Sequence, residues 1–208
     1  MKSGKVAPSF IELARRRQLV EAAIETIAEV GLAKASNAAI AARAQVSPAL
    51  INYHFGSRQG LISQTLATIQ QRVDEAMEPV GVDECYVSAL NGMLQRFAAY
   101  CLDNLPAMLV LTQVERRDRS DRTAADAERD KGLEELRSFV TEGQTAGQFR
   151  LVDAGLVASV LMNAMTDLPR EIRDRADADR TVFEQDWPLL LVNTIAVAAA
   201  PEGDHGDE

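Results

Sequence analysis

Apolar residues recur along the chain at intervals of three and four, which is the period of an amphipathic α-helix. In residues 9–30 the positions Val20, Ile24, Ile27 and Val30 follow this spacing, and Gly31 comes directly after them as a helix-ending residue. Runs of β-branched residues are short, and Ala, Leu, Glu, Arg and Gln dominate. The pattern therefore predicts an all-α protein.

Eight more helices are expected after the first, giving nine in all. Ser36, Ser47, Ser57 and Asp153 stand where an N-cap is needed, and Pro169 is expected to follow the end of the eighth helix. The break at residues 79–81 contains proline and glycine, so the elbow between two domains is expected nearby. The eight predicted helices span residues 37–44, 48–55, 58–78, 83–103, 106–117, 122–146, 154–167 and 181–200.

Charge divides the chain into a basic head and an acidic body. Residues 1–60 hold eight basic and four acidic side chains, a net +4, and because the whole chain carries −9 the remainder carries −13. Such a molecule can approach phosphate at one end only. The charged run at residues 116–130 is expected to be a solvated surface, and the acidic tail at 201–208 is expected to be disordered.

Several classes of protein are disfavoured by what the sequence lacks. Cys85 and Cys101 are sixteen residues apart, which is neither a redox nor a metal-binding spacing. No signal peptide is recognised, and the apolar stretch near the C-terminus is too short for a membrane span, so a cytoplasmic protein is expected. The two histidines, His54 and His205, stand far apart without a catalytic constellation, so neither an enzyme nor a cofactor or metal site is expected.

Residues 36–58 read SNAAIAARAQVSPALINYHFGSR and carry the most informative pattern. Two short helices separated by a three- or four-residue turn make a helix-turn-helix. The first is rich in alanine, which lets helices cross closely, and Ile40 supplies an apolar anchor. In the second, Leu50 or Ile51 and Phe55 can hold the helix to the core, which leaves its N-terminal end free for the major groove of DNA.

The stretch from Arg16 to Ile69, with its run IAARAQVSPALINYHFGSRQGLI, resembles the DNA-binding domain of the tetracycline-repressor (TetR) family. Within that family it is most similar to the choline–betaine regulator branch. The resemblance implies a three-helix DNA-binding head at residues 1–58 and a six-helix body at 59–200 that dimerises and binds a ligand. It also implies a homodimer that binds a palindromic double-stranded operator and is released by a small molecule, most often as a repressor.

Matching positions to the family pattern assigns roles to ten residues. Asn52 is the best candidate for reading a base, Tyr53 and His54 resemble phosphate-contacting groups, and Arg58 resembles a phosphate clamp. Three of these residues have a simpler alternative, since Tyr53 and His54 can be packed and Asn52 can be a surface cap or face solvent. Arg15, Arg16 and Arg17 can extend a phosphate track or merely face solvent. The DNA-binding set is Ser36, Asn37, Ser47, Pro48, Ala49, Leu50, Asn52, Tyr53, His54 and Arg58.

One position departs from the family pattern. Gln45 stands in the turn where glycine is usual. If the turn needs a left-handed backbone, a glutamine there costs about 1–2 kcal/mol.

In the body, large apolar side chains at helical spacing are candidates for lining a ligand pocket, although core packing explains such residues equally well. Arg96, Asn163 and Thr166 are candidate polar groups for the ligand. A dimer interface is expected from one stripe of Leu156, Val160, Asn163 and Ala164 and another of Leu190, Leu191, Thr194, Ile195 and Ala198. The candidate pocket residues are Met93, Phe97, Tyr100, Met108, Met162, Met165 and Trp187.

Two rival functions stay open beside the regulator. A helical dimer that binds DNA without sequence preference would show salt-dependent but sequence-independent affinity. An enzyme would need a catalytic constellation that the sequence does not offer. The sequence does not identify the effector, the operator, the regulated genes or the sign of regulation.

Overall fold

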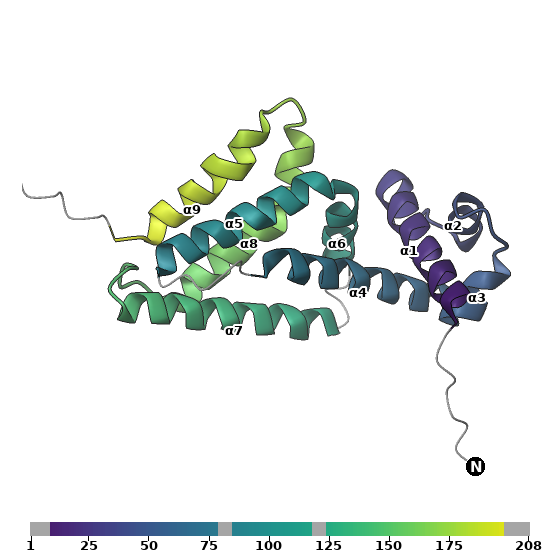
Figure 1. Cartoon of the computed structure of the whole chain (residues 1–208), viewed down its shortest axis with the longest axis horizontal. Helices are drawn as coiled ribbons and strands as arrows, with labels where there is room; N and C mark the ends of the chain where they lie inside the picture. Colours follow the sequence, from purple (N-terminus) through teal and green to yellow (C-terminus); the bar gives the residue numbers. More distant parts are fainter. Residues whose placement is uncertain (1–8, 79–84, 118–123, 198–208) are drawn as a thin grey trace, which may run out of the picture.

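The computed structural model describes residues 9–78, 85–117 and 124–197, in which the regular secondary structure is helical apart from a single isolated β-bridge. Figure 1 shows the N-terminal helices gathered at one end, a long helix that runs from them into the body, and the remaining helices packed beside it. The predicted acidic tail, the break at 79–81 and much of the charged run at 116–130 lie outside the described residues. The helices are α1 (Phe10–Val30), α2 (Asn37–Arg43), α3 (Ala49–Phe55), α4 (Arg58–Met77), α5 (Tyr86–Asp103), α6 (Leu105–Arg117), α7 (Ala124–Thr145), α8 (Ala154–Asp174) and α9 (Trp187–Ile195).

Helix α1 begins and ends as its local sequence requires. Ser9 accepts a hydrogen bond from the Glu12 backbone N–H, and the Glu12 carboxylate accepts one from the Ser9 backbone N–H, which is a capping box. Gly31 ends the helix at φ 79°, a conformation that disfavours other residues. The buried face of α1, which includes Leu19, Ala23 and Ile27, packs against α2, α3, α4 and α6.

The turn between α2 and α3 does need a left-handed backbone at position 45. Gln45, between α2 and α3, has φ 54° and is the only non-glycine with positive φ in the described part of the chain. Ser36 caps α2 by accepting from Ala39 N–H, as expected. Ser47, in contrast, does not cap α3: Pro48 takes the N-cap position without a side-chain bond. The Ser47 carbonyl accepts from Leu50 N–H, so a backbone turn replaces the expected side-chain cap.

Helix α4 joins the two ends of the molecule. Ser57 caps it by accepting from Gly60 N–H, and Leu61, Ile69 and Val73 are buried along it. It packs against α1 and α3 at one end and α5 and α6 at the other. A movement of the body can therefore reach the N-terminal helices through a single continuous helix (Figure 1).

In the body, α5 contacts α4, α6, α7, α8 and α9. Helices α7 and α8 pack along each other, and their connection is held by Phe149, which pairs as an isolated β-bridge with Ala196 after α9. Arg150 N–H donates to the Ile195 carbonyl at 2.8 Å, and Val197 N–H donates to the Gln148 carbonyl at 2.9 Å.

Two predictions about the last helices are wrong. Helix α8 does not end before Pro169 but continues to Asp174 with the proline inside it. A proline within a helix costs about 3 kcal/mol, and the burial of Leu168 and Ile172 on the same face, worth about 1.5–3 kcal/mol each, offsets this. The predicted helix at 181–200 instead begins as a π-turn at Val182–Asp186 and ends at Ile195, because Ala196 extends to pair with Phe149.

Candidate DNA-binding interface

Helix α3 has one face in the core and one face in solvent. Ile51 is fully buried, and Leu50 and Phe55 are half-buried against the neighbouring helices. Asn52 and Tyr53 are exposed, the latter with 70% of its surface in solvent. Ser47, Pro48 and Ala49 are also exposed at the start of the helix. The residues predicted to meet DNA are therefore presented together at one end of the molecule.

Helix α1 clamps the helix-turn-helix through Arg16. Its Nη1 donates to the His54 carbonyl at 2.6 Å, and its guanidinium lies 4.7 Å from the centre of the Phe55 ring. Gln18 Nε2 donates to the Ala44 carbonyl at 2.7 Å, which secures the turn between α2 and α3. Arg16 is thus a positioning residue, a role that depends on partners 38 and 39 positions away and has no local sequence signal.

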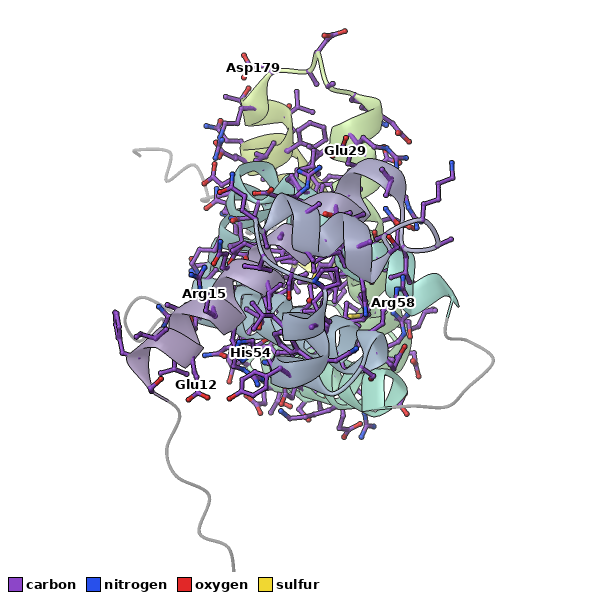
Figure 2. All side chains as sticks on the ribbon, turned by 90° about the vertical axis from the view of Figure 1, so that its right-hand side faces the viewer. Glu12, Arg15, Glu29, His54, Arg58 and Asp179 are labelled. Carbon is purple, nitrogen blue, oxygen red and sulfur yellow. The ribbon has the colours of Figure 1, made fainter. Side chains whose placement is uncertain are left out.

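Tyr53 and His54 are placed differently from each other. Their rings meet edge to face with centroids 4.9 Å apart, and His54 is half-buried. The Tyr53 hydroxyl is directed to Glu12, with its oxygen 3.4 Å from the carboxylate. The backbone N–H of Ser9 is the main cause that lowers the pKa of Glu12, so the carboxylate is ionised at neutral pH beside the exposed phenol. In Figure 2, Glu12, Arg15 and His54 lie on the same side of this end.

The structure gives Arg58 a different surrounding from the one that the sequence suggested. Its Nε donates to the Ala35 carbonyl at 3.1 Å and its Nη2 to the Leu32 carbonyl at 2.5 Å. Both acceptors belong to the connection between α1 and α2. These bonds tie the start of α4 to that connection, which gives Arg58 a positioning role, and its predicted phosphate contact stays a prediction.

Gly60 is a second positioning residue that sequence reasoning missed. A Cβ at this position would lie 2.1 Å from the Phe55 carbonyl oxygen, which is backbone and has little room to move. The end of α3 and the first turn of α4 approach each other closely only because residue 60 has no side chain.

The other predicted DNA-binding residues lie at the N-terminus of α2. Ser36 is exposed while its hydroxyl caps the helix, and Asn37 is half-buried with an Oδ1 that has no hydrogen-bond partner. Arg15, Arg17 and Lys34 are exposed basic residues of the same end. Arg43 differs from them because it forms ion pairs with Glu25 and Glu29. Figure 2 shows this end facing the viewer.

Among the predicted pocket residues, Phe97, Met108 and Met165 are buried in the core. Met93, Tyr100, Met162 and Trp187 are half-buried. Of the predicted polar groups, Asn163 accepts a hydrogen bond from Arg129 and Thr166 bonds to its own helix. Arg96 is different, because its Nε is buried without a partner.

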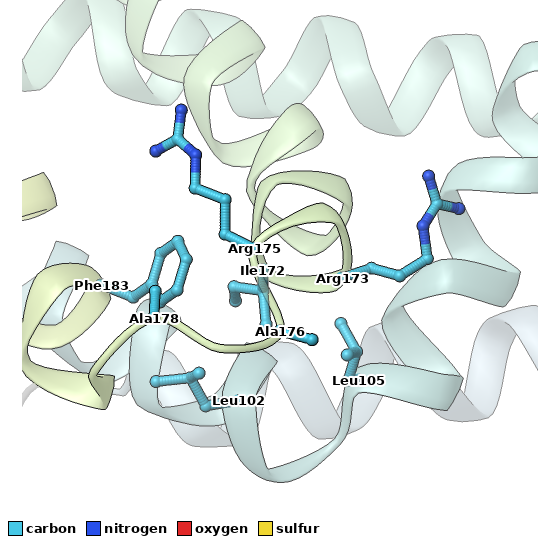
Figure 3. A pocket seen from close by; sticks show the side chains of 8 residues that line it. All are labelled: Leu102, Leu105, Ile172, Arg173, Arg175, Ala176, Ala178 and Phe183. Carbon is cyan, nitrogen blue, oxygen red and sulfur yellow. The ribbon is translucent and has the colours of Figure 1, made fainter.

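A hollow of about 250 Å³ lies elsewhere, between the ends of α5 and α8. Leu102, Ile172 and Phe183 are among its apolar lining, and none of the seven predicted pocket residues belongs to it. Figure 3 shows Arg173 and Arg175 extending away from the apolar residues. Each pairs with an acidic neighbour, Arg173 with Asp174 and Arg175 with Glu171. The hollow therefore offers an apolar surface with little unpaired charge.

Only some residues of the two apolar stripes predicted to form the dimer interface, on α8 and α9, are exposed to solvent. Leu156 and Val160 on α8 are exposed, the former to 66%, and Leu190 on α9 is exposed to 65%. Leu191 and Ile195, which were expected in the same stripe, are buried in the core, because residues four apart share a face and this face of α9 packs inward. Ala198 lies outside the described residues. Thr194 is exposed, as are Leu189 and Val197.

The described helices include none that is long and apolar enough to cross a membrane. In the same residues no group of three or more histidine, cysteine or acidic side chains is arranged to hold a metal ion.

Comparison with known proteins matches the N-terminal helices by sequence. Residues 19–65 match the profile of the bacterial regulatory proteins of the tetR family. The HTH-type transcriptional regulator BetI 1 of Chromohalobacter salexigens is 44% identical over 63 residues, which are 30% of this chain and 31% of the relative. BetI of Escherichia coli is 41% identical over 63 residues, 30% of this chain and 32% of the relative. The chain thus spans about a third of the length of the curated relatives it matches.

The fold of nearly the whole chain has solved counterparts. A bacterial regulatory protein of the tetR family from Rhodococcus RHA1 superimposes with a TM-score of 0.76 at 21% identity, covering 89% of this chain and 98% of the other. A TetR-like transcriptional regulator from Rhodococcus sp. RHA1 gives 0.73 at 18% identity, covering 91% and 98%. Residues 19–65 are thus similar to the tetR family of bacterial regulatory proteins, and the helical fold of the whole chain is similar to that of the solved structures.

Proposed function

We propose that this protein is a DNA-binding transcriptional regulator that reads a palindromic operator with α3, binds as a homodimer and leaves the operator when a small molecule binds its body. The observation that carries the proposal is the outward face of α3. Asn52 and Tyr53 stand in solvent on a short helix that Ile51 and the Arg16 clamp hold rigidly. The similarity of this segment to transcriptional regulators named BetI supports the same function.

Asn52 is proposed to read a base, because its amide can bond an adenine in the major groove through two hydrogen bonds. Ser47, Pro48, Ala49 and Leu50 are at the end of α3 that would enter the groove first. Tyr53, His54, Ser36 and Asn37 are proposed to meet phosphates or the groove edge, with exposed Arg15, Arg17 and Lys34 supplying positive charge around them. Residues 1–58 are then the DNA-binding domain and 59–200 the sensing and dimerising domain.

A second copy of the chain is the proposed partner of the outward faces of α8 and α9. Leu156, Val160 and Leu190 expose apolar surface that a monomer would leave in water. Two-fold pairing of these helices makes a four-helix bundle and sets two α3 helices at a fixed separation. Successive major grooves on one side of DNA are about 34–36 Å apart, which is the separation that the dimer must match.

Binding to DNA at one fixed salt concentration tests the function. The full chain is titrated against the site it selects from random DNA and against a shuffled version of that site. A sequence-reading regulator is expected to prefer the selected site by at least about 10³-fold. Equal affinity for both would instead show the non-specific helical dimer, and no affinity for either would refute DNA binding altogether.

The dimer has its own test. Leu190→Arg is expected to convert the protein to a monomer in light scattering after gel filtration, because a guanidinium cannot be buried unpaired. Gln185→Arg, an exposed change in the adjoining π-turn, is the control and is expected to stay dimeric. A monomeric wild-type protein at micromolar concentration would contradict the proposed interface.

A further inference from the structure

Two buried donors without partners lie one turn apart on α5. The Nε of Arg96 and the hydroxyl of Tyr100 are shielded from solvent, and neither has a hydrogen-bond partner. Residues four apart on a helix share a face, with about 6 Å between them. Buried polar atoms in folded proteins are nearly always paired, so two adjacent exceptions mark a place that lacks an acceptor.

Arg96 has a positive charge that no carboxylate in the described residues balances. Its one hydrogen bond there joins Nη2 to the Met77 carbonyl at the end of α4, at 3.4 Å. Its Nη1 lies over Gly92, and a Cβ added to Gly92 would be 3.2 Å from this nitrogen. The guanidinium therefore lies along α5 in space that a side chain at position 92 would occupy. A partly buried guanidinium without a counter-ion is costly, which makes this place suited to an anion.

Tyr100 faces the same neighbouring helix. Burial raises the pKa of its phenol, whereas the nearby Arg72 of α4 acts in the opposite direction. The phenol therefore keeps its proton at neutral pH and can donate it. Arg72 itself holds the Glu21 carboxylate of α1 through both terminal nitrogens. Tyr100 thus stands within electrostatic range of the ion pair that joins α4 to α1.

Two apolar side chains lie close to Arg96 and Tyr100 on α5. Met93 and Phe97 occupy the positions three residues before Arg96 and three before Tyr100, and the Phe97 ring centre is 6.5 Å from that of Trp187. Phe97 is buried in the core, so of these two only the half-buried Met93 has apolar surface that a bound compound can contact.

We propose that the seam between α4 and α5 binds a small organic carboxylate, with one oxygen accepting from Arg96 Nε and the other from Tyr100. Its negative charge competes with Glu21 for Arg72 and so loosens the contact between α4 and α1. The binding site stands on the structure alone, whereas its effect on DNA rests on the proposed function. Since coupling is reciprocal, a carboxylate that weakens DNA binding is itself bound more weakly by the DNA complex.

The fluorescence of Trp187, the only tryptophan in the chain, reports on this region. The full-length protein is titrated with sodium benzoate and sodium octanoate at constant ionic strength, with sodium chloride and choline chloride as the non-carboxylate and cationic controls. At least one carboxylate is expected to give a saturable change, and the two controls none. Arg96→Gln and Tyr100→Phe are each expected to weaken that binding about tenfold, as the loss of a hydrogen bond to a charged group does.

Two matched control variants remove a guanidinium and a phenol hydroxyl at sites away from Arg96 and Tyr100. Arg173→Gln lies at the apolar hollow, and Tyr86→Phe removes a phenol hydroxyl that bonds Glu142. Both are expected to bind the carboxylate as the wild type does. Tyr100→Phe is expected to unfold at the wild-type temperature or above it, because the deleted hydroxyl makes no bond in the folded protein. A folded Tyr100→Phe variant therefore keeps the test decisive.

Three results would overturn the inference: no saturable response to either carboxylate, a response equal in Arg96→Gln and wild type, or one abolished by Arg173→Gln instead. Each leaves the DNA-binding proposal standing if the wild type still prefers its selected site. If the unliganded wild type shows no such preference, the proposed function is refuted. Carboxylate binding can then still be tested, because fluorescence measures it without DNA. For the coupling, Glu21→Gln is expected to bind the carboxylate severalfold more tightly, because Arg72 is then released.

Discussion

Replacing Gln45 with glycine should stabilise the protein, which is unusual for a substitution that deletes a whole side chain. The backbone of Gln45 is left-handed at φ 54°, and its side chain is exposed. Relief of the left-handed conformation is worth about 1–2 kcal/mol. Glycine loses about 0.5–1 kcal/mol more backbone entropy on folding than a residue with a side chain. The expected net gain in the free energy of unfolding is about 0.5–1 kcal/mol.

Urea unfolding followed by circular dichroism measures this gain. With a slope of about 2–3 kcal/mol per molar urea, the midpoint should rise by about 0.2–0.5 M. All variants are compared at one protein concentration, because an oligomer's stability depends on it. Gln45→Ala keeps the left-handed strain and should not move the midpoint upward. Ala42→Gly, an exposed position within α2, should lower stability by about 0.5–1 kcal/mol.

The reasoning is refuted if Gln45→Gly is no more stable than Gln45→Ala. Such a result would mean that the turn between α2 and α3 is not left-handed in solution. The relative orientation of those two helices would then differ from the one described, and with it the outward face of α3.

Four further results are expected. Gly60→Ala should destabilise the protein by about 1–3 kcal/mol in the same urea assay, because its Cβ meets the Phe55 carbonyl, and an unchanged midpoint would contradict that close approach. Arg58→Ala should cost about 2–4 kcal/mol by leaving two carbonyls unbonded, while the salt dependence of DNA binding stays as in the wild type; a slope flatter by about one unit would instead reveal a phosphate contact. Cys101 should resist iodoacetamide at pH 8 in the folded protein and react after unfolding, because burial raises the pKa of its thiol to about 12, and rapid modification under native conditions would contradict its burial. Glu12 should titrate in an NMR experiment with a pKa below its ordinary value of 4.5, because its carboxylate accepts from the Ser9 backbone N–H. Its contribution to stability is complete above pH 4.5 and is lost as the pH falls through the lowered pKa of the folded protein. An ordinary pKa would show that the capping box is open in solution.

Local signals in the sequence predict most of the helix boundaries correctly. Ser36, Ser57 and Asp153 each cap the helix expected of them, since a cap involves only residues two or three positions away. Gln45, which stands where the family pattern has glycine, has a left-handed backbone. Such features depend on the backbone of a few neighbouring residues, so they can be predicted from the local sequence without knowledge of the fold.

Long-range contacts decide the features that sequence reasoning missed. Pro169 stays inside α8 because the surrounding residues are buried, and α9 stops at Ile195 because the next residue pairs with Phe149. Arg58 donates to carbonyls that lie 23 and 26 residues earlier, and this role comes in addition to the phosphate contact that the family pattern predicts. A local sequence pattern cannot predict a hydrogen-bond partner that is more than twenty residues away in the sequence.

The candidate site was predicted in part. Asn52 and Tyr53 are exposed, as the family pattern predicts. In an amphipathic helix the spacing of the apolar residues indicates which of the other positions face solvent. The clamp made by Arg16 and the ion pair between Arg72 and Glu21 were not foreseen. Both join separate helices, so they became visible only when the helices were placed in space.

Selection of bound sequences from random DNA, performed in parallel with the wild type and Asn52→Ala, tests most directly whether α3 reads the operator. The wild type should recover a two-fold symmetric site whose half-sites are one helical turn apart. The variant should recover the same spacing but lose its preference at one symmetric base pair in each half, with about 1–3 kcal/mol weaker binding to the wild-type site. Recovery of an identical motif with unchanged affinity would show that another surface reads the DNA.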